Sequence, residues 1–237
     1  ALDCVTVSER LRIEEAEEMF DIVKKSGLTY MMAETSYYQQ FTISARNFYR
    51  EGKFGTIFYC ESEYQHDGLE ELYVENGART WRYGVAPMHY PTHCTAHLIS
   101  VSGERLTQVS CNGWGDDDPI LKDNPYNNPF WNESVLFKTN RGSSFRVNVW
   151  WKGAHLGCER AQWIGNKMSF YSPNPVGSDS MIIRSSQKLG EDDAGFVRTE
   201  AKKQAYDQPS WCETELLPEP PDLSGFAAHP AAHQGFP

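Results

Sequence analysis

Apolar and polar residues follow a helical spacing over the first part of the chain. In residues 8–25 the apolar side chains recur every three or four positions, acidic residues crowd the first half and two lysines occupy the last turn, so a helix ending before Gly27 is predicted. Residues 28–33 are a short apolar run typical of a buried strand, and residues 41–50 form a second predicted helix that ends at Gly52. This succession is typical of the edge of an α/β layer.

After Gly55 the pattern changes to strict alternation. Residues 57–66 are predicted to be a strand in which Tyr64 and His66 lie on the face opposite to Ile57. A helix is expected at 92–101, and a loop rich in Asp, Asn, Pro and Gly at 113–129. A short segment containing Gly142 joins two strands as a hairpin. The further predicted strands are 106–111, 134–139, 144–151, 159–172 and 180–185.

These elements predict an α+β fold. We expect the remnant of an α/β edge, made of helix, strand and helix, followed by a large, open and mainly antiparallel sheet with helices on one face. Residues 1–54 would belong to an incomplete α/β domain and residues 55–216 to the sheet domain. Residues 217–237, dominated by Pro, Gly, Ala and His, are expected to be an extended tail.

The charge and cysteine content exclude several functional classes. With 22 Lys+Arg against 32 Asp+Glu, the net charge of -10 disfavours nucleic acid as a partner, because such binding needs clustered cations. We find no apolar run long enough to span a membrane and no leader, so a soluble, cytoplasmic protein is expected. The 6 cysteines include no CxxC pair, which argues against a zinc ribbon.

Acid/base chemistry gathers in the Tyr-Pro-Thr-His run at residues 90–93. Pro91 suits the first turn of the predicted helix and would hold Tyr90 and His93 at its entrance, where a phenol and an imidazole together can move protons near neutral pH. Glu34 ends a buried strand, and a buried carboxylate needs either a partner or a function. It could equally be a helix cap or an ion-paired acid.

Two patterns invite a metal site without favouring one. His93 and His97 share one helical face, but Cys94 stands where the zincin motif requires a glutamate, and His97 is better explained as a core histidine. The acidic run 116–118 lacks the alternating ligands and distal glutamate of an EF-hand. No metal is therefore expected.

Four motifs together resemble the Gfo/Idh/MocA oxidoreductases in their order and spacing: KSGLTYMMAE at 25–34, GKFG at 52–55, YQHD at 64–67 and YPTH at 90–93. The resemblance covers about residues 13–112. It implies NAD or NADP as cofactor, a Rossmann domain before an α/β sheet domain that builds the sugar pocket, and a homo-oligomer formed through the open sheet. The YPTH motif looks most like the branch with the NAD-dependent family 109 glycosidases.

The resemblance also implies a set of site residues. Carried over to this sequence, the catalytic candidates are His93 as general base, Tyr90 beside it, Tyr64 and His66. The resemblance also implies that Glu34 binds the cofactor. It implies that the neighbouring residues Trp81 and Arg82 bind the substrate.

The sequence also departs from the family. It has no GxGxxG turn to bind a pyrophosphate, so residues 1–54 would be the last elements of an incomplete dinucleotide-binding domain, either truncated or completed by a separate Rossmann chain. The Glu-Lys-Pro motif of many members is absent ahead of the first helix.

Three functions follow as hypotheses. The first is the substrate-binding part of an NAD(P)-dependent sugar oxidoreductase that exchanges hydride at a carbinol carbon. The second is a glycosidase that works by oxidation and elimination, which the missing lysine favours. The third is a non-catalytic carbohydrate-binding or dimerisation domain, in which Trp150, Trp151 or Trp163 could contact sugars or form an interface.

Overall fold

A computed structural model describes residues 3–5, 13–32, 34–155, 157–174, 179–191 and 197–205. Its main feature is one open sheet of 8 strands. The strands are β3 (Ile57–Gln65), β6 (Leu106–Trp114), β7 (Asn132–Thr139), β8 (Ser144–Trp150), β9 (Cys158–Gly165), β10 (Met168–Tyr171), β11 (Met181–Glu191) and β12 (Val197–Ala205). They lie in the order β12-β11-β10-β9-β3-β8-β7-β6, and only β3 and β8 pair in parallel. The predicted α+β class is confirmed.

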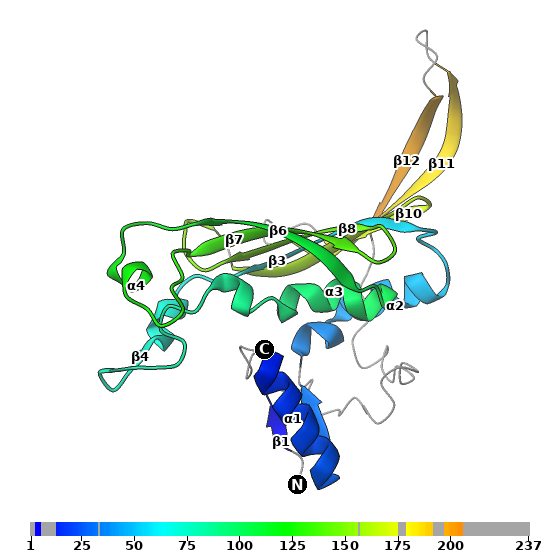
Figure 1. Ribbon diagram of the computed structural model, residues 1–237. Helices are drawn as coiled ribbons and strands as arrows, with labels where there is room; N and C mark the ends of the chain where they lie inside the picture. The colour runs from blue at the N-terminus through cyan, green and yellow to red at the C-terminus, as the bar shows by residue number, and fades with distance from the viewer. Residues whose placement is uncertain are drawn as a thin grey trace.

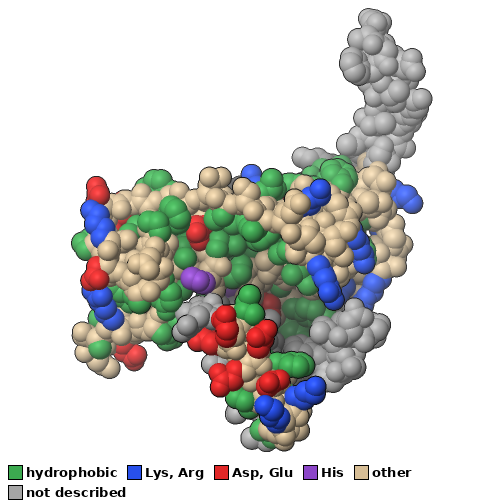
Figure 2. All heavy atoms as spheres, in the orientation of Figure 1, with side chains coloured by type: hydrophobic (Ala, Val, Ile, Leu, Met, Phe, Trp, Pro, Cys, Tyr) green, Lys and Arg blue, Asp and Glu red, His purple; other side chains and the backbone are tan. Residues whose placement is uncertain are grey.

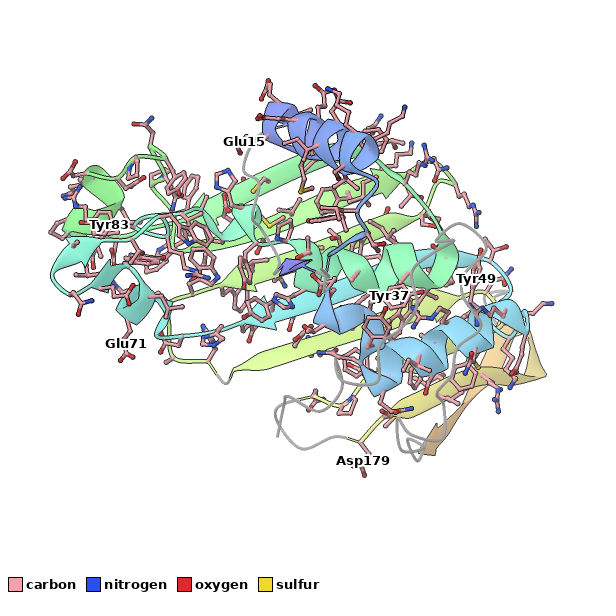
Figure 3. All side chains as sticks on the ribbon, turned by 90° about the horizontal axis from the view of Figure 1, so that it is seen from below. Glu15, Tyr37, Tyr49, Glu71, Tyr83 and Asp179 are labelled. Carbon is pink, nitrogen blue, oxygen red and sulfur yellow. The ribbon has the colours of Figure 1, made fainter. Side chains whose placement is uncertain are left out.

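Two helices, α2 (Gln40–Arg50) and α3 (Thr92–Ser102), lie on the same face of this sheet (Figure 1). Figure 3 shows them from that side, lying over the strands, with Tyr49 near the end of α2. Pro91 precedes α3, and Gly103 ends it in the left-handed conformation that glycine adopts at little cost. The predicted helix at 92–101 is therefore confirmed.

The core lies between these helices and the sheet. Residues at helical spacing on α3, Cys94, Leu98 and Val101, are buried against the alternate inward residues of the strands. Trp163 on β9 is fully buried and stacks on Phe170 of β10 with ring centroids 5.7 Å apart. Trp151 is buried as well, so two of the three tryptophans considered as sugar contacts serve the core.

A separate small unit precedes the sheet. Strand β1 (Asp3–Val5), helix α1 (Ile13–Ser26) and strand β2 (Tyr30–Met32) form a βαβ arrangement, since β1 pairs with β2 in parallel. Strand β1 was not predicted, and β2 is shorter than the predicted strand at 28–33, whose last residue lies outside the described residues, as do positions 8–12 of the first predicted helix. No residue of α1 is buried, and Figure 2 shows its acidic side chains gathered on the surface.

Two strand predictions and one loop prediction need correction. The predicted strand at 159–172 is a hairpin of β9 and β10, because residues between them turn to bring the two strands together in antiparallel register. A β-bulge between Ile57 and Tyr59 shifts the alternation, so Ile57 lies in the same core as Cys60 rather than on the opposite face. The expected loop at 113–129 begins later, since β6 continues to Trp114, and it contains the one-turn helix α4 (Pro119–Lys122).

The edge formed by β11 and β12 was only partly foreseen. The predicted strand at 180–185 is the first half of β11, which extends to Glu191, and β12 was not predicted. Together they form a hairpin that projects beyond the rest of the sheet (Figure 1). The hairpin predicted around Gly142 is present between β7 and β8.

At the other end of the sheet, short elements surround a second cluster of buried residues. They are the 3₁₀ helix η2 (Leu69–Leu72), the strands β4 (Val74–Glu75) and β5 (Ala78–Arg79), the 3₁₀ helix η3 (Pro87–His89) and α4. Tyr73 stacks on Trp131 with centroids 6.2 Å apart, and Tyr83 packs beside them (Figure 3). This end carries the Trp81-Arg82 pair and leads into α3.

The remaining predictions on organisation stay open. The division at residue 54 stays a prediction, and the tail at 217–237 lies outside the described residues.

No helix in the described part of the chain is long and apolar enough to cross a membrane. The acidic run at 116–118 is neutralised by lysine: Lys152 Nζ lies 2.7 Å from Asp116 Oδ2, and Lys122 Nζ lies 2.9 Å from Asp117 Oδ1.

Candidate functional site

Three of the aromatic site candidates meet in one cluster. Tyr64 lies near the end of β3, Tyr90 closes η3, and His93 lies in the first turn of α3. The Tyr64 and His93 rings stack with centroids 4.5 Å apart and an interplanar angle of 17°. The Tyr90 ring lies 5.2 Å from His93 and 6.0 Å from Tyr64. Two segments distant in sequence therefore converge on the face of the sheet that carries the helices.

The loop before α3 is fixed to the sheet by a hydrogen bond. The backbone N–H of Met88, within η3, donates to Glu133 Oε2 on β7 at 2.6 Å. Pro87 occupies the start of η3, where a fixed φ is favourable and no N–H is needed. This contact sets the position from which Tyr90 and His93 reach the cluster.

Glu34 enters the cluster from the 3₁₀ helix η1 (Thr35–Tyr38), which it caps. Its Oε1 accepts a hydrogen bond from the Ser36 N–H at 2.9 Å and lies 3.4 Å from His93 Nδ1. The two structural explanations offered for this buried carboxylate, cap and ion pair, therefore both apply. These contacts leave open the cofactor role that the resemblance implied, which stays a prediction.

Glu159 completes the surroundings of His93 and was missed by the sequence analysis. It lies on β9 directly opposite Tyr64 of β3, and its Oε1 is 3.6 Å from His93 Nδ1. The Ser36 hydroxyl donates a hydrogen bond to the same carboxylate and lies 3.0 Å from His93 Nδ1. No local motif marks Glu159, because only the pairing of β3 with β9 brings it to the site.

The flanking carboxylates keep His93 charged. Burial alone lowers the pKa of His93, but hydrogen bonds and charges from Glu159 and Glu34 raise it to about 9. Burial likewise opposes the ionised form of Glu34, yet the hydrogen bond and charge of His93 lower its pKa to about 2. The pKa of Glu159 is lowered too: burial acts against this shift, and the contact with His93 outweighs it. At neutral pH the cluster is an imidazolium between two carboxylates.

The two tyrosines keep their protons in this setting. Burial is the main cause that raises the pKa of Tyr64 and of Tyr90, and the nearby Glu34 and Glu159 charges add to it. Both phenols are therefore hydrogen-bond donors at neutral pH. A polar ligand held beside His93 would meet two O–H groups and one N–H group.

His97 has a different character from His93, one turn away on α3. It is fully buried, its Nδ1 lies 2.7 Å from Ser62 Oγ and its Nε2 lies 3.4 Å from Gln39 Oε1. Burial lowers the pKa of His97 to about 4, so the ring is neutral. An Nε2–H that donates to Gln39 and an Nδ1 that accepts from Ser62 satisfy both nitrogens, which agrees with a core histidine.

The remaining candidates lie at the margin of the cluster. His66 is exposed just beyond β3, with its ring 6.0 Å from Tyr64 and its Nδ1 3.0 Å from the Asp67 carbonyl oxygen. The Arg82 guanidinium lies 4.4 Å from the ring centroid of Trp81, and its charge acts against the burial that raises the pKa of Tyr90. Trp81 itself is 46% exposed. The charge of Arg82 thus connects the Trp81–Arg82 pair electrostatically with Tyr90 of the cluster.

The opposite face of the sheet carries a polar network. Arg146 Nη2 lies 2.5 Å from Glu61 Oε1, and Arg160 Nε donates to Glu63 Oε2 at 2.7 Å. Both carboxylates are buried, although they lie on the face opposite to α2 and α3 (Figure 1). The network is therefore a separate feature from the His93 cluster, on the other side of β3.

The donor set fits proton chemistry better than metal binding. Within the described ranges, no group of three or more His, Cys, Asp or Glu side chains is arranged to hold a metal ion. The sequence also contains no GxGxxG turn, the usual glycine-rich turn that binds a pyrophosphate.

The fold matches solved structures of larger proteins. An NAD-binding oxidoreductase from Klebsiella pneumoniae matches with a TM-score of 0.61 and 10% identity, over 84% of this chain and 53% of that protein. A scyllo-inositol dehydrogenase from Lactobacillus casei, with bound NAD(H) and scyllo-inositol, matches with a TM-score of 0.55 and 16% identity over 76% of this chain and 55% of its own.

A third match is an inositol dehydrogenase homologue from Azotobacter vinelandii in complex with NADH and myo-inositol, with a TM-score of 0.57 and 14% identity over 85% of this chain and 49% of its own. No protein-family model and no curated protein matches the sequence. The chain thus shares the fold of these oxidoreductases and spans about half of their length.

Proposed function

We propose that this chain is the substrate-binding part of an NAD(P)-dependent oxidoreductase of the Gfo/Idh/MocA type, which exchanges hydride at a carbinol carbon of a sugar or related polyol. The observation that carries the proposal is the convergence of Tyr64, Tyr90 and His93 with Glu34 on one face of the sheet. Phenol and imidazole donors in a partly buried setting suit the recognition of hydroxyl groups. The fold shared with proteins solved with inositols supports the same class of ligand.

His93 is the proposed acid/base. Its Nδ1 faces Glu34, Ser36 and Glu159, whereas no group in the described part of the chain hydrogen-bonds to its Nε2. In the neutral form of His93, Nε2 can accept the proton of a substrate hydroxyl while Tyr90 donates a hydrogen bond to the same oxygen. Because contacts with the carboxylates raise the pKa of His93 to about 9, the reactive neutral form increases toward alkaline pH.

The redox step belongs to the cofactor, NAD or NADP, whose nicotinamide accepts or returns the hydride. Because the sequence contains no GxGxxG turn, we propose that the cofactor is held by a Rossmann domain, in the same polypeptide or in a separate chain. Glu34 is the residue of this chain proposed to lie next to the cofactor. His66, Arg82 and Trp81 are proposed to contact the substrate at the margin of the site.

A glycosidase that works through oxidation and elimination is the second candidate. The observation that favours it is the absence of the Glu-Lys-Pro motif before α1, where many oxidoreductases of this type carry a catalytic lysine. The YPTH motif at 90–93 points to the same branch. In this mechanism NAD would be regenerated in each cycle, so no reduced cofactor would accumulate.

The polar face of the sheet is the proposed surface for homo-oligomer formation. The Glu61–Arg146 and Glu63–Arg160 pairs form a charge-balanced network on the face opposite to α2 and α3 (Figure 1). Sedimentation velocity of the protein would measure its oligomeric state directly, and a monomer at all concentrations would exclude the proposed homo-oligomer.

A cytoplasmic location stays a prediction from the sequence.

The decisive experiment measures ligand binding and turnover together. Isothermal titration of the natural polypeptide with inositols, sugars and aryl glycosides, with and without NAD or NADP, should show heat for a polyol. The absorbance of reduced nicotinamide then separates the candidates: steady accumulation indicates a dehydrogenase, and glycoside cleavage without accumulation indicates a glycosidase. Binding of a polyol without any turnover would leave a carbohydrate-binding domain, and an absence of polyol binding would refute the proposal.

A matched pair of variants tests the role of His93. We expect His93→Ala to lower turnover by about 10²- to 10⁴-fold, the usual contribution of a general acid/base. His155→Ala removes a histidine that packs against Trp150, away from the cluster, and should keep wild-type turnover. Equal turnover in both variants would remove His93 from the mechanism.

A further inference from the structure

The two nitrogens of His93 have unequal surroundings. Three acceptors crowd Nδ1: Ser36 Oγ at 3.0 Å, Glu34 Oε1 at 3.4 Å and Glu159 Oε1 at 3.6 Å. Nε2 receives no hydrogen bond from the described residues. Among the described residues, the polar contacts of the imidazole are therefore confined to Nδ1.

Ser36 stands between His93 and Glu159. Its hydroxyl donates its single proton to Glu159 Oε1, so the lone pairs of Oγ remain to accept the Nδ1–H of His93. The backbone N–H of Ser36 is directed to Glu34. The fully buried Ser36 thus orders both carboxylates around one nitrogen.

We propose that Glu159, acting through the Ser36 hydroxyl, is a positioning residue that keeps the proton of His93 on Nδ1 and leaves Nε2 to exchange a proton with the substrate. The identity of that substrate rests on the proposed function. The positioning itself rests only on the geometry of the three side chains. Glu159 does not touch the reacting atoms.

The place of Glu159 on β9 argues against a purely structural role. The next inward positions on this strand, Ala161 and Trp163, are buried apolar residues of the core. A carboxylate on the same face carries a desolvation penalty that an apolar side chain would avoid. On this strand, Glu159 is placed where it contacts Ser36 and His93.

Glu34 is held in place differently from Glu159. Its Oε1 already accepts the Ser36 N–H and caps η1, so its position is set by the backbone. Glu159 has no backbone contact of this kind among its described interactions and acts through a side-chain hydroxyl. The other titratable groups that face His93 are Tyr64 and Tyr90, from β3 and η3, with His97 on the next turn of α3.

Nuclear magnetic resonance of His93 tests the proposal. The ¹⁵N shifts of the imidazole report the tautomer, and their dependence on pH gives the pKa, in the whole protein and without substrate. In Glu159→Gln we expect the pKa of His93 to fall by about one unit or more, since an opposite charge at this distance shifts a pKa by 1–3 units. In Ser36→Ala the nearest acceptor of the Nδ1–H is lost while the Glu34 and Glu159 oxygens remain farther away, so we expect the share of the Nε2–H tautomer in the neutral ring to rise.

Glu63→Gln is the matched control. It removes a buried carboxylate from the neighbouring strand β3, but on the opposite face of the sheet, and should leave the titration and the tautomer of His93 unchanged. If Glu159→Gln fails to fold, Ser36→Ala still tests the arrangement by the tautomer alone. An unchanged tautomer in Ser36→Ala, or an unchanged pKa in a folded Glu159→Gln, overturns the proposal.

Turnover separates this inference from the proposed function. If the His93 signals change as expected but no polyol is oxidised or cleaved, the positioning stands and the proposed reaction fails. If turnover is present and falls in Glu159→Gln with an altered pH profile, both stand. Turnover together with unchanged His93 signals keeps the reaction and rejects Glu159 as its positioning residue.

Discussion

At the scale of single residues, two histidines one helical turn apart have opposite properties because of their neighbours. His93 lies between the carboxylates of Glu34 and Glu159. His97 lies in the core between Ser62 and Gln39. The same side chain is thus a charged group in one place and a neutral packing group in the other. Exposure and partners, more than residue type, decide the chemistry.

This contrast gives a stability prediction for His97. Replacing it by alanine leaves a cavity beneath Trp163 and removes the partner of the buried Ser62 hydroxyl, so His97→Ala should lower the free energy of unfolding by about 2 kcal/mol. Urea denaturation measures this loss. The control is His155→Ala, outside the core cluster, which should cost less than about 1 kcal/mol. A His97 variant as stable as the wild type would contradict the assignment to the core.

The residues that could be found from the sequence are those in short motifs. Tyr90 and His93 are held together by Pro91 within four consecutive positions, and the alternation of β3 placed Tyr64 on a definite face. Glu159 could not be found in this way, because its approach to Tyr64 depends on the antiparallel register of β3 and β9, nearly one hundred residues apart. Local patterns do not encode such a register.

At the scale of elements, the hairpin of β9 and β10 shows what the sequence analysis lacked. Its strands are separated by a tight turn without a Pro or an Asn-Gly pair, so apolar residues on both sides were merged into one strand. The bulge near Ile57 has a similar origin, because an extra residue in one strand is visible only against its partner. Helix α3 was predictable in full, since a proline and a glycine mark its ends.

Gly165 at the end of β9 provides a prediction at this scale. A Cβ at this position would lie 2.3 Å from the Phe54 carbonyl oxygen and 2.8 Å from that of Met168, both of them backbone atoms that cannot move aside freely. Gly165→Ala should therefore lower the free energy of unfolding by more than about 2 kcal/mol. Thermal denaturation followed by circular dichroism measures the effect.

Gly103 is the appropriate comparison for that variant. It has φ of 68° and no atom within 4 Å of an added Cβ, so Gly103→Ala has only the cost of the left-handed conformation, about 1 kcal/mol. The expected order is wild type, Gly103→Ala and then Gly165→Ala in falling stability. Equal stabilities for the two variants would mean that the turn after β9 relaxes to accept the methyl group.

At the scale of the whole molecule, the sheet separates two polar systems. On one face, helices cover the core and the His93 cluster; on the other, the Glu61 and Glu63 carboxylates pair with arginines. The general architecture followed from the alternation of residues along the strands. The extent of β11 and β12, by contrast, depends on pairing at the sheet edge, which a single-strand pattern does not specify.

The buried titratable groups make the stability of the whole protein depend on pH in a defined direction. Contacts with Glu159 and Glu34 raise the pKa of His93 from 6.5 to about 9, against the effect of burial, so its stabilisation is complete below pH 6.5 and is lost as the pH rises to 9. Burial lowers the pKa of His97 from 6.5 to about 4, so its contribution is complete above pH 6.5 and is lost as the pH falls to 4. Contacts with His93 lower the pKa of Glu34 from 4.5 to about 2, despite burial, which adds a loss below pH 4.5.

These opposite slopes predict a maximum in the free energy of unfolding near pH 6.5, falling by on the order of 1 kcal/mol per unit of pKa difference on either side. Urea denaturation between pH 4 and 9 measures the profile. His93→Ala should flatten its alkaline side, and His97→Ala should flatten its acidic side between pH 6.5 and 4. Stability that instead increases from pH 6.5 to 9 would mean that His93 is not held as an imidazolium between Glu34 and Glu159, because the loss of that charge should lower the stability over this range.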